Sequence, residues 1–142
     1  MQQVKHLLEG KGKAVYAVAP DASVYEAIRQ MADKNVGALV VIKGSELVGI
    51  VSERDYARKV ILKDRSSRDT PVAEIMTASV ITVASDATVD ECMRLCTDGR
   101  LRHLPVLDGT SIVGVVSIGD LVKAVISEQR ETINQLESYI TS

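Results

Sequence analysis

The chain has 142 residues, of which 46% are hydrophobic and 25% charged, a balance typical of a soluble globular protein. A formal charge of −2, with four Tyr and no Phe or Trp, argues against nucleic-acid binding. No apolar run approaches the roughly 20 residues that cross a bilayer. The N-terminal segment MQQVKHLLEGKGK lacks the apolar core of a signal peptide, so we expect a cytoplasmic protein without membrane contact.

The chain contains an internal repeat, because residues 15–61 align without a gap over residues 80–126. A repeated unit of this size usually cannot bury its own apolar face, which predicts two halves that pack around a common core. We place the first repeat, with the N-terminal segment, at residues 1–69. The second repeat, with a helical C-terminal extension, occupies residues 70–142.

Each copy predicts a short strand, a helix, a hairpin of two strands and a second helix. The strands are expected at Tyr16–Val18, Ala38–Ile42 and Leu47–Ser52, and again at Ile81–Val83, His103–Leu107 and Ile112–Ser117. The helices are expected after the N-caps Ser23 and Thr88, at Glu53–Leu62, and from Ile118 onward. The fold class is therefore α+β, with two β-α-β-β-α repeats related by a pseudo-twofold axis and an extended C-terminal helix.

The two cysteines, Cys92 and Cys96, lie four residues apart and therefore share one face of the predicted helix. The first copy has Ala27 and Met31 at these positions, which favours core packing over a metal or redox pair. With two His and no CxxC motif, we expect no metal cofactor.

Two segments lie outside the repeated elements. The connector at residues 62–79 is charged and turn-rich at first, and its apolar end is predicted to dock on the fold. The last helix continues beyond the second copy with a narrow stripe at 3-4-3-4 spacing, made of Ile126, Gln129, Ile133, Leu136 and Ile140. Such a stripe is typical of a coiled-coil contact, which favours a homodimer, whereas the alternative is packing back on its own module.

The candidate chemistry lies where the second hairpin strand meets the second helix, in the sequences GIVSERD and GVVSIGD. Ser52 and Ser117 offer hydroxyls that can cap a helix or donate to a phosphate. Asp55 and Asp120 offer carboxylates that can accept two hydrogen bonds from a diol such as ribose. The alternative is structural, because S-x-x-D is also the pattern of a capping box.

These motifs carry a family resemblance. The tandem repeat, its two G-h-h-S-x-x-D motifs, AEIMT before the second copy and RHLPV inside it resemble a pair of CBS domains, the cystathionine-β-synthase-type repeats of Bateman modules. The resemblance covers residues 12–126 and is closest to two-repeat proteins similar to the regulatory insert of inosine monophosphate dehydrogenase. It implies a regulatory protein that binds an adenosine-containing ligand and signals to a partner such as a regulated enzyme. AMP, ADP, ATP, NAD and S-adenosylmethionine all contain adenosine, and we expect AMP, ADP, ATP or NAD.

The resemblance also implies two clefts between the repeats, in which Asp holds the ribose, Ser reaches phosphate and apolar strand segments sandwich the adenine. The cleft of Asp55 is expected to use Ser52, Arg54 and Asp55 with, from across, Met76, Thr77, Ile81, Arg102 and His103. The cleft of Asp120 is expected to use Ser117 and Asp120 with, from across, Lys13, Tyr16, Gly37 and Ala38.

Comparison of the copies predicts that the clefts differ. Arg102 and His103 stand where the first copy has Gly37 and Ala38. Because phosphate recognition uses cationic donors, a phosphorylated ligand should prefer the Asp55 cleft. The alternative is that Arg102 is a solvated strand residue and His103 only a neighbour of Pro105.

The comparison of the copies leaves three possible states for the Asp120 cleft. It holds a less charged adenosyl group, uses Lys11 and Lys13 from the approach strand, or stays empty.

The sequence has no GxGxxG motif, no P-loop and no credible catalytic constellation, so we expect no enzyme activity. The competing hypothesis is a structural or protein-interaction dimer module with vestigial clefts.

Overall fold

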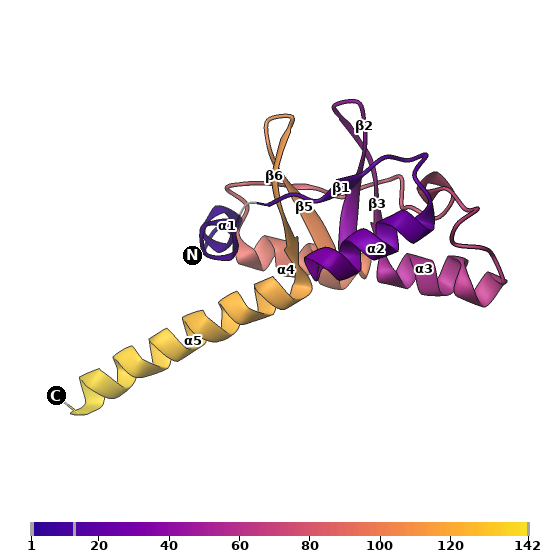
Figure 1. Cartoon of the computed structure of the whole chain (residues 1–142). Coiled ribbons are helices and arrows are strands. Elements are labelled where there is room, and N and C mark those ends of the chain that lie inside the picture. The colour runs from indigo at the N-terminus through magenta and orange to yellow at the C-terminus, as the bar shows by residue number, and fades with distance from the viewer. Residues whose placement is uncertain (1, 13, 142) are drawn as a thin grey trace. The chain divides into compact units, whose positions relative to one another are not determined.

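The structure, a computed structural model that describes residues 2–12 and 14–141, divides the chain into two compact units (Figure 1). One unit is Val15–Ile81, and the other combines the residues before it with those after it. This grouping differs from the predicted division between residues 69 and 70. The N-terminal segment groups with the second repeat although it precedes the first, and residues 70–81 group with the first repeat although they precede the second.

Both units have the same mixed α and β architecture, as expected. The Val15–Ile81 unit contains β1 (Ala17–Val18), α2 (Val24–Lys34), β2 (Ala38–Lys43), β3 (Glu46–Ser52) and α3 (Glu53–Lys59), followed by 3-10 turns at Ile61–Lys63 and Val72–Glu74. The other contains α1 (Val4–Lys11), β4 (Val83–Ala84), α4 (Val89–Gly99), β5 (His103–Asp108), β6 (Ser111–Ser117) and α5 (Ile118–Thr141). In each sheet the short first strand runs parallel to the middle strand, which forms an antiparallel hairpin with the last.

Local sequence signals explain most element boundaries. The hydroxyl of Ser23 accepts a hydrogen bond from the Glu26 amide, and Thr88 caps α4 in the same way. Gly44 and Gly109 have φ angles of 64° and 65° in the hairpin turns, as predicted. Lys11, which was expected on an approach strand, is instead the last residue of the helix α1, which spans Val4–Lys11.

Each unit has its own hydrophobic core. In the Val15–Ile81 unit, α2 packs its buried face, formed by Val24, Ala27 and Met31, against the middle strand. In the other unit the equivalent face of α4 is formed by Val89, Cys92 and Cys96. Both cysteines are reduced and buried, which confirms their prediction as core residues. Burial raises the pKa of the Cys92 thiol to about 11, and that of Cys96 in the same direction.

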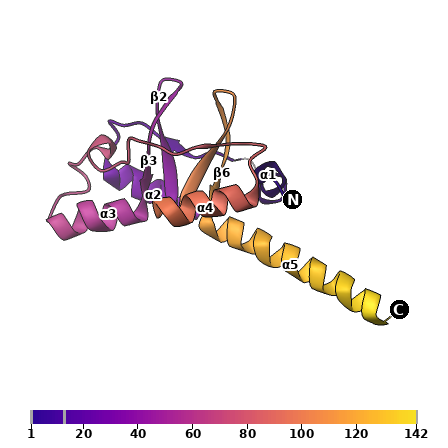
Figure 2. The ribbon, with the colours of Figure 1, turned by 180° about the vertical axis from the view of Figure 1, so that it is seen from behind.

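Two short segments dock on the units through equivalent backbone hydrogen bonds. The amide of Val72 donates to Ala22 O at 2.8 Å, and the amide of Val4 donates to Ala87 O at 2.9 Å. Both valines are fully buried. The connector therefore docks as predicted, and α1 takes the corresponding place on the other unit, beside β6 and α4 (Figure 2).

The last helix, α5, begins inside its unit and continues well past it (Figure 1). Leu121 and Ala124 are buried in the core, whereas every described residue from Ile126 onward is exposed. The stripe of this helix therefore does not pack back on the core of its own unit.

Candidate functional site

The first S-x-x-D motif forms a complete capping box at the junction of β3 and α3. The Asp55 carboxylate accepts hydrogen bonds through Oδ2 from the amide and hydroxyl of Ser52, at 2.9 and 3.0 Å. The Ser52 hydroxyl accepts in return from the Asp55 amide at 3.2 Å. These bonds fix the orientation of the carboxylate at the end of the strand.

The second motif repeats this geometry at the junction of β6 and α5. The amide of Ser117 donates to Asp120 Oδ2 at 2.8 Å, and the amide of Asp120 donates to Ser117 Oγ at 3.2 Å. The structural alternative raised by the sequence is therefore present at both positions. In both motifs Oδ2 of the aspartate accepts the hydrogen bond from the serine amide.

Each motif lies beside a matching pair of residues on the neighbouring strand. Ser52 is opposite Ala38 in the β-ladder, and Gly37 O accepts from the Glu53 amide at 3.1 Å. In the other unit Ser117 is opposite His103, and Arg102 O accepts from the Ile118 amide at 2.8 Å. Within its own unit the Arg102–His103 pair thus adjoins Asp120. The expected contribution of this pair to the Asp55 cleft remains a prediction.

Three other expected residues belong to the same unit as Asp55 rather than to the opposite one, which corrects their assignment. Thr77 pairs with Ile50 of β3 through two backbone hydrogen bonds of 2.9 and 3.0 Å. Met76 lies against Gly49, where an added Cβ would come within 2.5 Å of its sulfur. Ile81 ends this unit and is 43% exposed. Because Gly49 has no side chain, it leaves room for the connector, and this is the physical reason why the connector lies against β3.

Three of the residues expected opposite Asp120, namely Tyr16, Gly37 and Ala38, lie in the Val15–Ile81 unit, as the prediction requires. Tyr16 O accepts from the Val40 amide at 3.2 Å, and the ammonium of Lys34 lies 5.5 Å from the centre of the Tyr16 ring. Ala38 is the first residue of β2, and Gly37 directly precedes it. Lys13 lies outside the described residues. The structure thus leaves the composition of this cleft as a prediction.

Comparison with known proteins identifies the family. The CBS-domain family model matches residues 12–62 and 72–127, which together make up most of the chain. The chain belongs to the CBS-domain family. The resemblance inferred from the duplicated motifs is therefore confirmed.

Relatives of this CBS pair include a plant protein and several proteins of solved structure. The mitochondrial CBS domain-containing protein CBSX3 of Arabidopsis thaliana is 43% identical over 96% of this chain and 71% of its own length. A solved protein with CBS domains from Burkholderia ambifaria MC40-6 is 51% identical, with a TM-score of 0.86 over 90% of this chain and 96% of that one. The CBS pair of protein MJ0100, solved with 5′-methylthioadenosine and S-adenosyl-L-methionine, is 25% identical with a TM-score of 0.80. The match covers 90% of this chain and 98% of that one.

One residue of the site was missed by the sequence reasoning. In this CBS pair the ammonium of Lys59 lies 3.2 Å from Asp55 Oδ1 and donates to the Ile75 carbonyl at 2.8 Å. It therefore joins the carboxylate, α3 and the docked connector. The i,i+4 spacing from Asp55 was an available signal. The second copy has Ala124 at this position, so the two aspartates differ in their electrostatic surroundings.

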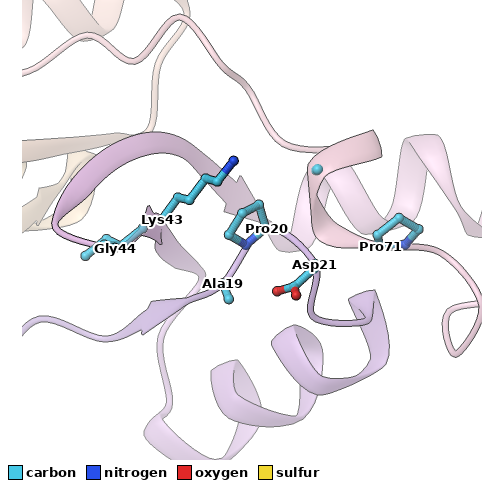
Figure 3. A pocket seen from close by; sticks show the side chains of 8 residues that line it. Ala19, Pro20, Asp21, Lys43, Gly44 and Pro71 are labelled. Atoms are coloured by element: carbon cyan, nitrogen blue, oxygen red, sulfur yellow. The ribbon is translucent and has the colours of Figure 1, made fainter.

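The described residues also form an open hollow at the far end of the β2–β3 hairpin from Ser52 (Figure 3). Its walls are the turn at Ala19–Asp21, the hairpin turn at Lys43 and Gly44, and Pro71 of the connector. It contains none of the expected ligand residues. Among residues 2–12 and 14–141, no cluster of His, Cys, Asp and Glu suits a metal ion, and no helix is long and apolar enough to span a membrane.

Proposed function

We propose that this CBS pair is a regulatory module that binds an adenosine-containing ligand, AMP, ADP, ATP or NAD, and passes its bound state to a partner protein. The observation that carries the proposal is the duplicated cap, which holds an aspartate at the same strand–helix junction in both units. A related pair solved with two adenosyl compounds supports the ligand class. No catalysis is part of the proposal.

The proposed contacts follow from the fixed carboxylates. A ribose diol has two hydroxyl donors, and a carboxylate held by its own cap accepts them without first being ordered. The Ser52 hydroxyl currently donates to Asp55, so a donation to phosphate would require it to rotate. The proposed sites keep the residues expected from the sequence, with Met76 and Thr77 supplied by the unit of Asp55 itself.

We further propose that the more phosphorylated ligand prefers Asp55. Arg54 and Lys59 stand on the same short helix as this aspartate, whereas Gly119 and Ala124 occupy the equivalent positions of the second copy. Two additional cations favour an anionic ligand. The expected approach of Arg102 and His103 would add to the same preference.

A purely structural or protein-interaction role is the second candidate. Its specific support is that both S-x-x-D motifs are already used as helix caps. In that case the aspartates would affect stability alone. Self-association through α5 is compatible with either role, and we propose a homodimer. The relative CBSX3 is named mitochondrial, and a cytoplasmic location stays a prediction.

The test is calorimetric titration of the purified chain with AMP, ADP, ATP and NAD. Loss of the charged hydrogen bonds to ribose in Asp55→Ala should weaken nucleotide binding about 10- to 100-fold. Asp120→Ala should weaken binding at the second site, where that site is occupied, and should leave the affinity of the Asp55 site unchanged.

Each of these variants also loses a helix cap, so Thr88→Ala serves as the matched control. It removes the cap of α4, at a cost of about 1 kcal/mol in stability, and it touches no proposed ligand residue. Native mass spectrometry of the untreated protein identifies any ligand that purifies with it. Equal affinity in wild type and Asp55→Ala would reject the site, and no binding of any tested nucleotide would favour the structural role.

A further inference from the structure

The exposed half of α5 carries an apolar stripe that the fold of the chain does not cover. Its members, with Gln129 included, recur at spacings of three and four residues. The hydrophobic members are between 40% and 80% exposed: Val122, Ile126, Ile133, Leu136 and Ile140. Gln129 occupies the one polar position of the series. Leu121 and Ala124, which anchor the helix in the core, face a different side. The stripe is therefore separate from the buried face.

We propose that this stripe binds the same stripe of a second copy of the chain as a parallel, in-register two-stranded coiled coil. This inference rests on the proposed self-association and adds its orientation. In heptad terms Ile126, Ile133 and Ile140 occupy the a positions, with Gln129 and Leu136 at d. Isoleucine at a with leucine at d is the combination that favours parallel dimers.

Gln129 gives the second argument for this orientation. In a parallel, in-register pair it faces Gln129 of the second copy, and each side-chain amide can both donate and accept a hydrogen bond. A buried polar pair of this kind fixes register and orientation, because any other alignment leaves the amides unpaired.

The antiparallel arrangement is less compatible with the same residues. Stacking the stripe in the opposite direction places Gln129 against Ile133 of the second copy, which leaves its amide without a partner. It also brings Arg130 close to Arg130 of the second copy, where like charges repel. One favourable contact remains, between Lys123 and Glu137 of the second copy, but an exposed ion pair contributes only about 0.2–1 kcal/mol.

The anchoring of α5 makes a short contact feasible. An isolated helix as short as the exposed part of α5, residues 126–141, would be close to marginal in water, because its first turn is costly to form. Here the first turns are already held by Leu121 and Ala124 in the core, so the exposed turns extend an existing helix. Since the contact spans little more than two heptads, we expect a weak, concentration-dependent dimer.

Disulfide trapping of the full chain tests the orientation. In the parallel pair, Ile140→Cys places two thiols in one a layer, whereas the antiparallel pair would hold them about 27 Å apart at 1.5 Å per residue. We expect most of the Ile140→Cys chain to form a covalent dimer under mild oxidation. Ser138→Cys, on the opposite face of the helix, is the matched control and should give at least fivefold less. The native Cys92 and Cys96 are buried with raised thiol pKa values and should give little background.

Sedimentation of the same chains separates the two ways of failing. A wild-type chain that remains as monomeric as one truncated after Ile126 would reject self-association through α5, and the coiled coil with it. A wild-type dimer that is lost on truncation, yet gives no excess of Ile140→Cys dimer over the control, would reject only the parallel orientation. Dissociation by Lys123→Glu, reversed when Glu137→Lys is added, would establish the antiparallel pair instead.

Discussion

At the scale of single residues, the C-termini of α2 and α4 place different side chains in the same demanding backbone conformation. Asn35 and Arg100 occupy equivalent positions and have left-handed φ angles of 55° and 53°. Asparagine tolerates this left-handed region because its short polar side chain can hydrogen-bond locally, whereas a longer side chain such as that of arginine is disfavoured there. In the sequence the two positions differ visibly only in charge, because a positive φ at a non-glycine residue depends on the whole helix end.

We therefore expect Arg100→Gly to stabilise the chain by roughly 0.5–1 kcal/mol, since glycine relieves the strain despite its greater entropy in the unfolded state. Asn35→Gly is the matched control and should change stability little. Urea unfolding followed by circular dichroism measures both. A destabilised Arg100→Gly would mean that the arginine side chain makes a stabilising contact that outweighs its strain.

At the scale of elements, the glycines that open the two G-h-h-S-x-x-D motifs admit the docked segments. A Cβ on Gly114 would lie 2.5 Å from a Leu8 methyl, and one on Gly49 would meet both the Met76 side chain and, at 3.1 Å, the Thr77 carbonyl. The strands and helices were predictable from periodicity and capping residues. The docking of the connector was predicted, but its position on β3 was not, and neither was α1, because the buried faces of these segments are defined by contacts with distant parts of the sequence.

Substitution of these glycines should separate the two kinds of contact. Gly49→Ala and Gly114→Ala should each lower the free energy of unfolding by about 1–3 kcal/mol through overpacking. The effect should be larger for Gly49, because the Thr77 carbonyl cannot rotate away as the Leu8 side chain can. Gly10→Ala has open space around it in α1 and should instead stabilise by up to about 1 kcal/mol. Chemical denaturation of the three variants gives the comparison, and a neutral Gly49→Ala would contradict the docking of the connector on β3.

At the scale of the whole molecule, the two units do not follow the order of the sequence. The duplicated repeat was visible in the sequence because its copies align without a gap. The equivalence of the two docked segments was not detected, because they are offset by a different number of residues from the repeat itself: Val4 corresponds to Val72, although Ala22 corresponds to Ala87. The candidate site shows the same limit, since its aspartates could be found from the motifs but the contact of Lys59 with Ile75 and the placement of Met76 depend on the docked connector.

This grouping predicts an effect at a distance along the chain. Deletion of residues 2–11 removes α1, with the buried Val4 and Leu8, from the unit that contains the second repeat. Hydrogen exchange measured by mass spectrometry should then accelerate at least tenfold in β5 and β6, with little change in β2 and β3. Equal acceleration in both hairpins, or in the β2–β3 hairpin alone, would contradict the division into these units.

The placement of α1 also bears on how the chain would respond to a single cut. A protease acting between Asp69 and Thr70 would leave two fragments, each of which keeps the segment that completes the other. The N-terminal fragment would still contribute Val4 to the unit of the C-terminal one, and the C-terminal fragment would still contribute Val72 in return. The nicked protein should therefore migrate as one particle in native conditions and separate only on unfolding, whereas neither half expressed alone contains a complete folding unit.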